Sequence, residues 1–194
     1  MIPAQVQQCD FNKFHTADNL VNARFLVRHG QCISNLTWPI DGYTDEIDVL
    51  TELGVQQAEN LCRYFERFEV HYQVISSPLT RARQTADIIC GKLPRTTLHP
   101  FDQRLIEKNH EEPLDIFCAR LNSFMQGPWC SPGPWILVVH GHLIETLLNE
   151  FMRAEYTLVE RQDGTRGLPG VWGAANGSVS SIIGDKFVTF NHVP

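Results

Sequence analysis

The sequence predicts an α/β fold, a three-layer α/β/α sandwich with a mostly parallel central sheet. Two short apolar runs, 25–27 and 136–139, are each followed within a few residues by helical or turn-rich sequence, a pattern typical of buried parallel strands. The first run leads into His29-Gly30 and the second into His140-Gly141. Because ligands of open α/β sheets bind beyond the carboxyl ends of the strands, we expect these two histidines to meet there.

Strand and helix signals alternate along the rest of the chain. Thr51 is the predicted N-cap of a helix whose apolar residues, such as Ala58 and Cys62, recur at helical spacing. Ser77-Pro78 predicts the start of a second helix, with serine as the cap and proline at the first helical position. The other predicted elements are strands over 72–75, 98–101, 178–183 and 187–190, and helices over 114–125 and about 143–151, while the helix after Ser77 ends near Gly91.

The 194 residues suit one domain, which we assign to residues 23–194. Residues 1–22 lack clear periodicity and are predicted to form an N-terminal arm, with a disordered extension as the alternative. The net charge is −6 and the basic residues are scattered, which argues against nucleic-acid partners or an anionic membrane surface. No stretch approaches the ~20 apolar residues of a membrane span, so we expect no membrane partner.

Cysteine usage bears on the compartment. The six cysteines contain no Cys-x-x-Cys pair and are spread widely, which favours reduced thiols over a disulfide framework or a zinc site. The first 22 residues are polar where a signal peptide would have an apolar core. We therefore expect a cytoplasmic protein.

Several separated motifs occur in one order along the chain. They are Arg28-His29-Gly30 with Asn35, 50–54 followed by Gln57-Ala58, 76–79 followed by Arg81-Ala82 and 84–86, Val139-His140-Gly141, and 176–179. With these motifs the chain resembles the histidine phosphatase superfamily, also called phosphoglycerate mutase-like, from Arg24 to the end. The resemblance implies the phosphoglycerate mutase-like fold. It also implies a small phosphatase that hydrolyses phosphomonoesters through a phosphohistidine intermediate, with no metal and no cofactor.

The resemblance also implies catalytic roles for three residues. His29 would attack phosphorus, with its other ring nitrogen held by a backbone carbonyl. Glu107, in the segment 104–107, would protonate the leaving oxygen and later activate water. His140 would serve as a charged donor to the phosphoryl oxygens.

Substrate binding needs convergent cations, because a phosphoryl group spreads negative charge over three oxygens. Arg28 and Arg81 are always charged near neutral pH and can each hold two of these oxygens. Asn35 is expected to contact the phosphate, and His142 is placed with these residues at the substrate-binding site.

Some residues depart from the family pattern. Residues 108–112 replace the usual segment after Glu107, so Glu111 is an alternative acid. His142 stands where a second glycine is common, and Glu145 where an arginine often follows, which disfavours highly anionic substrates. Cys32 occupies a position usually held by a hydroxyl residue, and we interpret it as a buried substitute rather than a redox switch, although a nearby arginine could lower its pKa.

The preferred interpretation is a phosphomonoester hydrolase acting on a small phosphorylated metabolite. One alternative is phosphoglycerate mutase-type phosphoryl transfer, which the short chain disfavours because mutases are usually longer. The other is a catalytically silent phosphate-binding module of the same fold, which the altered segment after Glu107 keeps open. We expect a small phosphorylated substrate as the partner, and a homodimer stays open.

Overall fold

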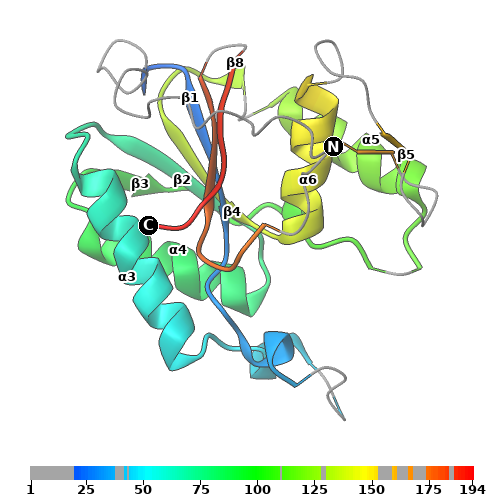
Figure 1. The fold of residues 1–194 in the computed structure, drawn as a ribbon, viewed down its shortest axis with the longest axis horizontal. Helices are drawn as coiled ribbons and strands as arrows, with labels where there is room; N and C mark the ends of the chain where they lie inside the picture. The colour runs from blue at the N-terminus through cyan, green and yellow to red at the C-terminus, as the bar shows by residue number, and fades with distance from the viewer. Residues whose placement is uncertain are drawn as a thin grey trace, which may run out of the picture.

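A six-stranded sheet forms the centre of the fold, in the order β3-β2-β4-β1-β7-β8 (Figure 1). The computed structural model describes residues 20–37, 42, 44–109, 111–127, 130–152, 159–160, 166–167, 174–183 and 186–194. Strands β3, β2, β4 and β1 are parallel, whereas β7 is antiparallel to β1 and β8 is antiparallel to β7. The mostly parallel sheet is thus confirmed. The strands are β1 Ala23–Arg28, β2 Tyr72–Ser76, β3 Thr96–Leu98, β4 Trp135–Val139, β7 Val179–Ile183 and β8 Lys186–His192, with β5 Val159–Glu160 and β6 Arg166–Gly167 paired separately.

Helices cover both faces of this sheet, which confirms the three layers (Figure 1). Phe25 and Val27 of β1 pack with one pair of helices, and Leu26 between them packs with the other pair, as the two-residue period of a strand requires. The first pair is α3 Glu52–Glu66 and α4 Thr80–Lys92, and the second is α5 Leu114–Met125 and α6 Gly141–Met152. Three short 3₁₀ helices are η1 Ile33–Asn35, η2 Asp45–Ile47 and η3 Gln103–Leu105.

Three predicted starts are wrong by two residues, and one of them is that of α6, which begins at Gly141 instead of about residue 143. Helix α4 begins at Thr80, because Leu79 is extended and the Ser77 hydroxyl accepts from Leu79 N, at 3.3 Å, in the turn before the helix. Strand β3 begins at Thr96 instead of residue 98, and its pairing with β2 runs only to Leu98. The predicted cap of α3 is confirmed, since the Thr51 side chain accepts from Gly54 N.

Close backbone packing fixes the loop that follows β1. A Cβ atom on Gly30 would collide with the backbone of Gly54, and one on Gly54 would collide with the backbone of Gln31. Only glycine permits such an approach. The start of α3 therefore supports the loop that carries His29.

Some sequence predictions fall largely outside the described residues. The arm predicted at residues 1–22 is described only from Leu20 onward. Within the described part of the chain, no helix is long and apolar enough to cross a membrane.

The five cysteines described there are all free thiols.

Candidate active site

The carboxyl ends of the central parallel strands bring the two predicted histidines together. Arg28 is paired with Val139 across β1 and β4, so the residues that follow each strand emerge at one edge. His29 N donates to Val139 O at 3.1 Å. The imidazole centroids of His29 and His140 are 5.2 Å apart. The meeting of the two histidines is thus confirmed.

His29 is buried and held in one tautomer. Its Nε2 accepts a hydrogen bond from Arg81 Nε at 3.2 Å, because a guanidinium nitrogen can only donate. Its Nδ1 therefore carries the proton and donates to Gly30 O at 2.8 Å. Burial, aided by the charge of Arg81, lowers the pKa of His29 to about 3. The ring is neutral at pH 7, with the Nε2 lone pair turned toward Arg81.

A buried carboxylate positions Arg81. Arg81 Nη1 donates to Asp48 Oδ2 at 3.0 Å, and Asp48 also accepts from Ser34 N and Ser34 Oγ at 2.9 Å each. Burial acts to raise the pKa of Asp48, but the hydrogen bonds from Ser34 and the charge of Arg81 outweigh it and leave the pKa below its ordinary value. Asp48 thereby fixes both the arginine and the loop after His29.

Asp45 anchors the start of α4. Its carboxylate accepts from Thr80 N at 3.0 and 3.1 Å and from Thr80 Oγ1 at 2.9 Å, and it lies 3.9 Å from Arg81 Nη1. A carboxylate at a helix N-terminus satisfies donors that the helix itself leaves open. Asp45 and Asp48 were not among the residues predicted for the site; the signal that could have found them is their place in the long loop between residues 35 and 48.

Arg28 is the last residue of β1, directly before His29. One of its guanidinium N–H groups donates to Ala174 O, and its Nε is buried without a hydrogen-bond partner among the described residues. Burial lowers the pKa of Arg28, while the charges of Glu107 and Glu145 raise it. Two arginines from different elements therefore approach the histidines.

The Asn35 side chain forms hydrogen bonds within the loop that follows β1 and to Asn176. Its Oδ1 accepts from Cys32 N at 3.1 Å and from Asn176 Nδ2 at 2.9 Å, and Asn176 Nδ2 also lies 3.3 Å from His29 O. A phosphate contact by Asn35 stays a prediction. Cys32 is fully buried, and burial raises the pKa of its thiol. The charge of Arg81 acts to lower this pKa, as expected of a nearby arginine, but burial outweighs it.

His140 is fully buried beside His29. Its Nε2 lies 2.8 Å from Ser77 Oγ and its Nδ1 lies 3.4 Å from Glu107 Oε2. Burial, followed by the neighbouring His29 and Arg81, lowers the pKa of His140 well below its ordinary value. The protein alone thus favours neutral His140, and the charged donor expected from the sequence needs the negative charge of a phosphoryl group beside it.

The carboxylate of Glu107 lies within 3.4 Å of ring nitrogens of both His140 and His142. Leu105 is buried in the core with α5 and α6 and anchors the segment two residues earlier. The Glu107 carboxylate lies between His140 and His142, with Oε1 3.2 Å from His142 Nδ1. Glu111 is exposed. The geometry favours Glu107 over Glu111 as the acid.

Two more side chains near Glu107 come from α6. The His142 side chain is 76% exposed, and its hydrogen bond to Glu107 raises its pKa. Glu145, one turn later, is buried, and its charge acts on both Arg28 and His142. Carboxylates therefore stand close to the cations of the site.

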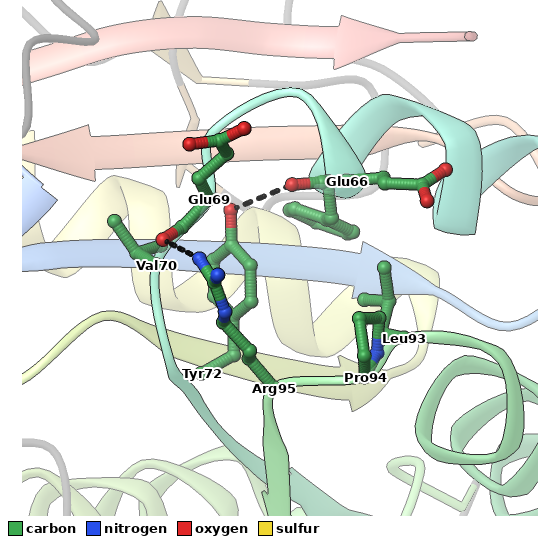
Figure 2. Close-up of a pocket in the computed structure, with 8 residues that line it drawn as sticks. Glu66, Glu69, Val70, Tyr72, Leu93, Pro94 and Arg95 are labelled. Atoms are coloured by element: carbon green, nitrogen blue, oxygen red, sulfur yellow. Dashed lines mark hydrogen bonds between the residues drawn. The ribbon is translucent and has the colours of Figure 1, made fainter.

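A separate pocket of about 270 Å³ lies at the opposite edge of the sheet, at the start of β2 (Figure 2). Phe65, Tyr72 and Leu93 form its apolar part, and Arg95 Nη1 donates to Glu69 O at 2.6 Å beside it. None of the predicted site residues lines this pocket. It is distinct from the cluster of histidines.

Comparisons with known proteins agree with the fold. Residues 24–112 match the model of the histidine phosphatase superfamily (branch 1). Phosphoglycerate mutase from Bacillus anthracis strain Sterne superposes with a TM-score of 0.63 at 20% identity, over 86% of this chain and 90% of that one. A variant of phosphoserine phosphatase from Entamoeba histolytica gives a TM-score of 0.57 at 20% identity, over 88% and 97%. A mycobacterial glucosyl-3-phosphoglycerate phosphatase in complex with VO3 gives 0.56 at 20% identity, over 82% and 90%.

No curated protein sequence matches the chain. The family match and the shared fold nevertheless confirm the resemblance indicated by the sequence motifs. Residues 24–112 are thus similar to the histidine phosphatase superfamily, and the chain has the α/β fold of phosphoglycerate mutase-like structures.

Proposed function

We propose that this protein is a phosphomonoester hydrolase that forms a phosphohistidine on His29. The observation that carries the proposal is the neutral, buried His29, whose Nε2 is directed at the Arg81 guanidinium while Nδ1 is bound to Gly30 O. A neutral imidazole beside fixed cationic donors has the nucleophile and the charge that phosphoryl transfer requires.

The first step transfers the phosphoryl group to the enzyme. The oxygens of the substrate take the Arg81 N–H groups, which frees the Nε2 lone pair of His29. Nε2 then attacks phosphorus and the ester P–O bond breaks. The leaving oxygen takes its proton from the carboxylic acid of Glu107, which becomes a carboxylate.

The second step hydrolyses the phosphohistidine. The Glu107 carboxylate removes a proton from water, the water oxygen attacks phosphorus, and the P–N bond breaks. Phosphate leaves, Glu107 is again protonated and His29 is again neutral. Arg28 and Arg81 supply the positive charge throughout, so we propose that no metal ion is required.

The charges of the site suggest a substrate class. Asp45 and Asp48 flank Arg81, while Glu145 and Glu107 act on Arg28. A second phosphate or several carboxylates on the substrate would meet these acidic groups, so we propose a small metabolite with few negative charges beyond its phosphate. The free cysteines support the cytoplasm as its location.

Release of phosphate from 4-nitrophenyl phosphate in the presence of a chelator tests the proposal. The expected result is turnover that the chelator does not change and that His29→Ala abolishes. Phosphoserine and 3-phosphoglycerate extend the test, since proteins of similar fold are named for such compounds. Isomerised phosphoglycerate without free phosphate would identify a mutase, and binding of phosphate esters without turnover would identify a silent binding module.

A further inference from the structure

His142 and Glu107 form a hydrogen-bonded pair between the solvent and the buried histidines. His142 Nδ1 lies 3.2 Å from Glu107 Oε1, and the other carboxylate oxygen lies 3.4 Å from Nδ1 of His140. The His142 side chain is 76% exposed, whereas that of Glu107 is 23% exposed and that of His140 is fully buried. Glu107 thus lies between the solvent-exposed imidazole of His142 and the buried imidazole of His140.

We propose that His142 is a positioning residue that keeps Glu107 supplied with the proton given to the leaving oxygen. The inference rests on the proposed function. The imidazolium of His142 gives its Nδ1 proton to Glu107 Oε1, and the resulting carboxylic acid gives a proton to the leaving oxygen as the P–O bond breaks. His142 is then neutral, and the proton removed from the attacking water in the second step restores the pair.

The surrounding charges favour one shared proton on this pair. Glu107 and Glu145 both favour the imidazolium of His142, while Arg28 and partial burial oppose it. The balance is a raised pKa for His142, with the hydrogen bond to Glu107 as the largest cause. A lone glutamate with a pKa near its usual value of about 4.3 would have lost almost all of its proton at pH 7. The raised pKa of His142 lets the pair hold a proton to a higher pH than an isolated imidazole would.

The consequence is a pH dependence that differs between substrates. An alkyl phosphate needs a proton on its leaving oxygen, whereas nitrophenolate leaves without one. For an alkyl phosphate, kcat/KM should fall on the alkaline side only as His142 loses its proton, above about pH 6.5. Without His142, the fall should move toward the pKa of a carboxylic acid.

The test compares wild type with His142→Gln, on glycerol 1-phosphate and on 4-nitrophenyl phosphate. Glutamine can donate a hydrogen bond to Glu107 but has no proton to transfer. At pH 7 we expect His142→Gln to lower kcat/KM for glycerol phosphate about tenfold or more relative to kcat/KM for the nitrophenyl ester, whose leaving oxygen needs no proton. His71→Gln is the matched control, because His71 is exposed at the amino end of β2 and its Nε2 lies 2.8 Å from Thr97 Oγ1, at the other end of the strand from the site.

An alkaline limb for glycerol phosphate that is unchanged in His142→Gln would overturn the inference, while continued hydrolysis of the nitrophenyl ester would leave the proposed function standing. An NMR titration of the His142 imidazole provides a readout that needs no turnover. Its pKa should fall in Glu107→Gln, because the amide removes the negative charge beside it. An unchanged His142 pKa in that variant would also overturn the inference.

Discussion

Asp48 and Arg81 form a buried ion pair directly behind His29. Arg81 Nη1 donates to Asp48 Oδ2 at 3.0 Å, and Asp48 has no exposed surface. The same guanidinium donates through Nε to His29 Nε2. Asp48, which directly follows η2, therefore fixes the position of the Arg81 guanidinium relative to His29.

Replacing this carboxylate should damage both the fold and the site. In Asp48→Asn, the new amide N–H groups would face Ser34 N or Arg81, which are also donors. Because one partner of a buried pair is lost, we expect a cost of about 3–5 kcal/mol in the free energy of unfolding and at least about a tenfold loss of kcat/KM for nitrophenyl phosphate. Urea unfolding and steady-state kinetics measure the two effects.

Glu46→Gln is the control for this variant, because Glu46 is exposed two residues away in η2, the 3₁₀ helix that ends just before Asp48. It should change neither quantity noticeably. Wild-type activity in folded Asp48→Asn would show that Arg81 does not depend on Asp48.

The acid role separates Glu107 from Glu111. Glu107→Gln should reduce turnover of alkyl phosphates far more than turnover of nitrophenyl phosphate, since only the alkyl oxygen needs a proton to leave. A loss of about 100-fold or more is expected for the alkyl ester. Glu111→Gln should be mild, because Glu111 is exposed. The opposite ranking in parallel assays of both variants would move the acid to Glu111.

Buried neutral histidines make stability depend on pH. His29 has a pKa of about 3 in the folded protein, against about 6.5 in the unfolded chain. Between these values the unfolded state binds more protons, so stability that is complete above pH 6.5 is lost as the pH falls, by up to about 1.4 kcal/mol per pH unit and histidine. His140 is shifted in the same direction.

Urea titrations at pH 7, 6 and 5 follow this loss. His29→Asn should show a shallower dependence than wild type, because one of the two contributing imidazoles is gone. Equal slopes for the two proteins would contradict the low pKa of His29.

Two glycines should respond to alanine in opposite ways. Gly30→Ala places a methyl group against the backbone of Gly54, and we expect it to cost about 2 kcal/mol or more, because two backbone segments must separate. Gly91 is exposed in α4, and a Cβ there meets nothing within 4 Å. Gly91→Ala should stabilise by up to about 1 kcal/mol through helix propensity. Thermal unfolding of both variants checks the signs, and a stable Gly30→Ala would refute the close packing of the loop.

The sequence predicted the parts of the site that strands position. His29 and His140 follow apolar runs, and parallel strands deliver the residues after them to one edge, so periodicity was enough. The layers were predictable for the same reason, because Phe25 and Leu26 belong to uninterrupted apolar runs buried on both faces.

Residues held by long-range contacts were not predictable in the same way. Asp48 acts on Arg81 across 33 positions, and Asp45 caps α4 across 35; no local pattern encodes either bond. The cap from Asp45 also explains why α4 begins at Thr80 and not at Pro78. The choice between Glu107 and Glu111 required the position of Leu105 in the core, which the sequence of the loop does not specify.

The central claim is a covalent phosphoryl group on His29, and trapping it is the most direct measurement. The protein is mixed briefly with a ³²P-labelled phosphate ester, quenched in alkali, digested and mapped. The account predicts acid-labile, alkali-stable label on the peptide that contains His29, and none in His29→Ala. Label on another residue, or turnover by His29→Ala at the wild-type rate, would contradict it.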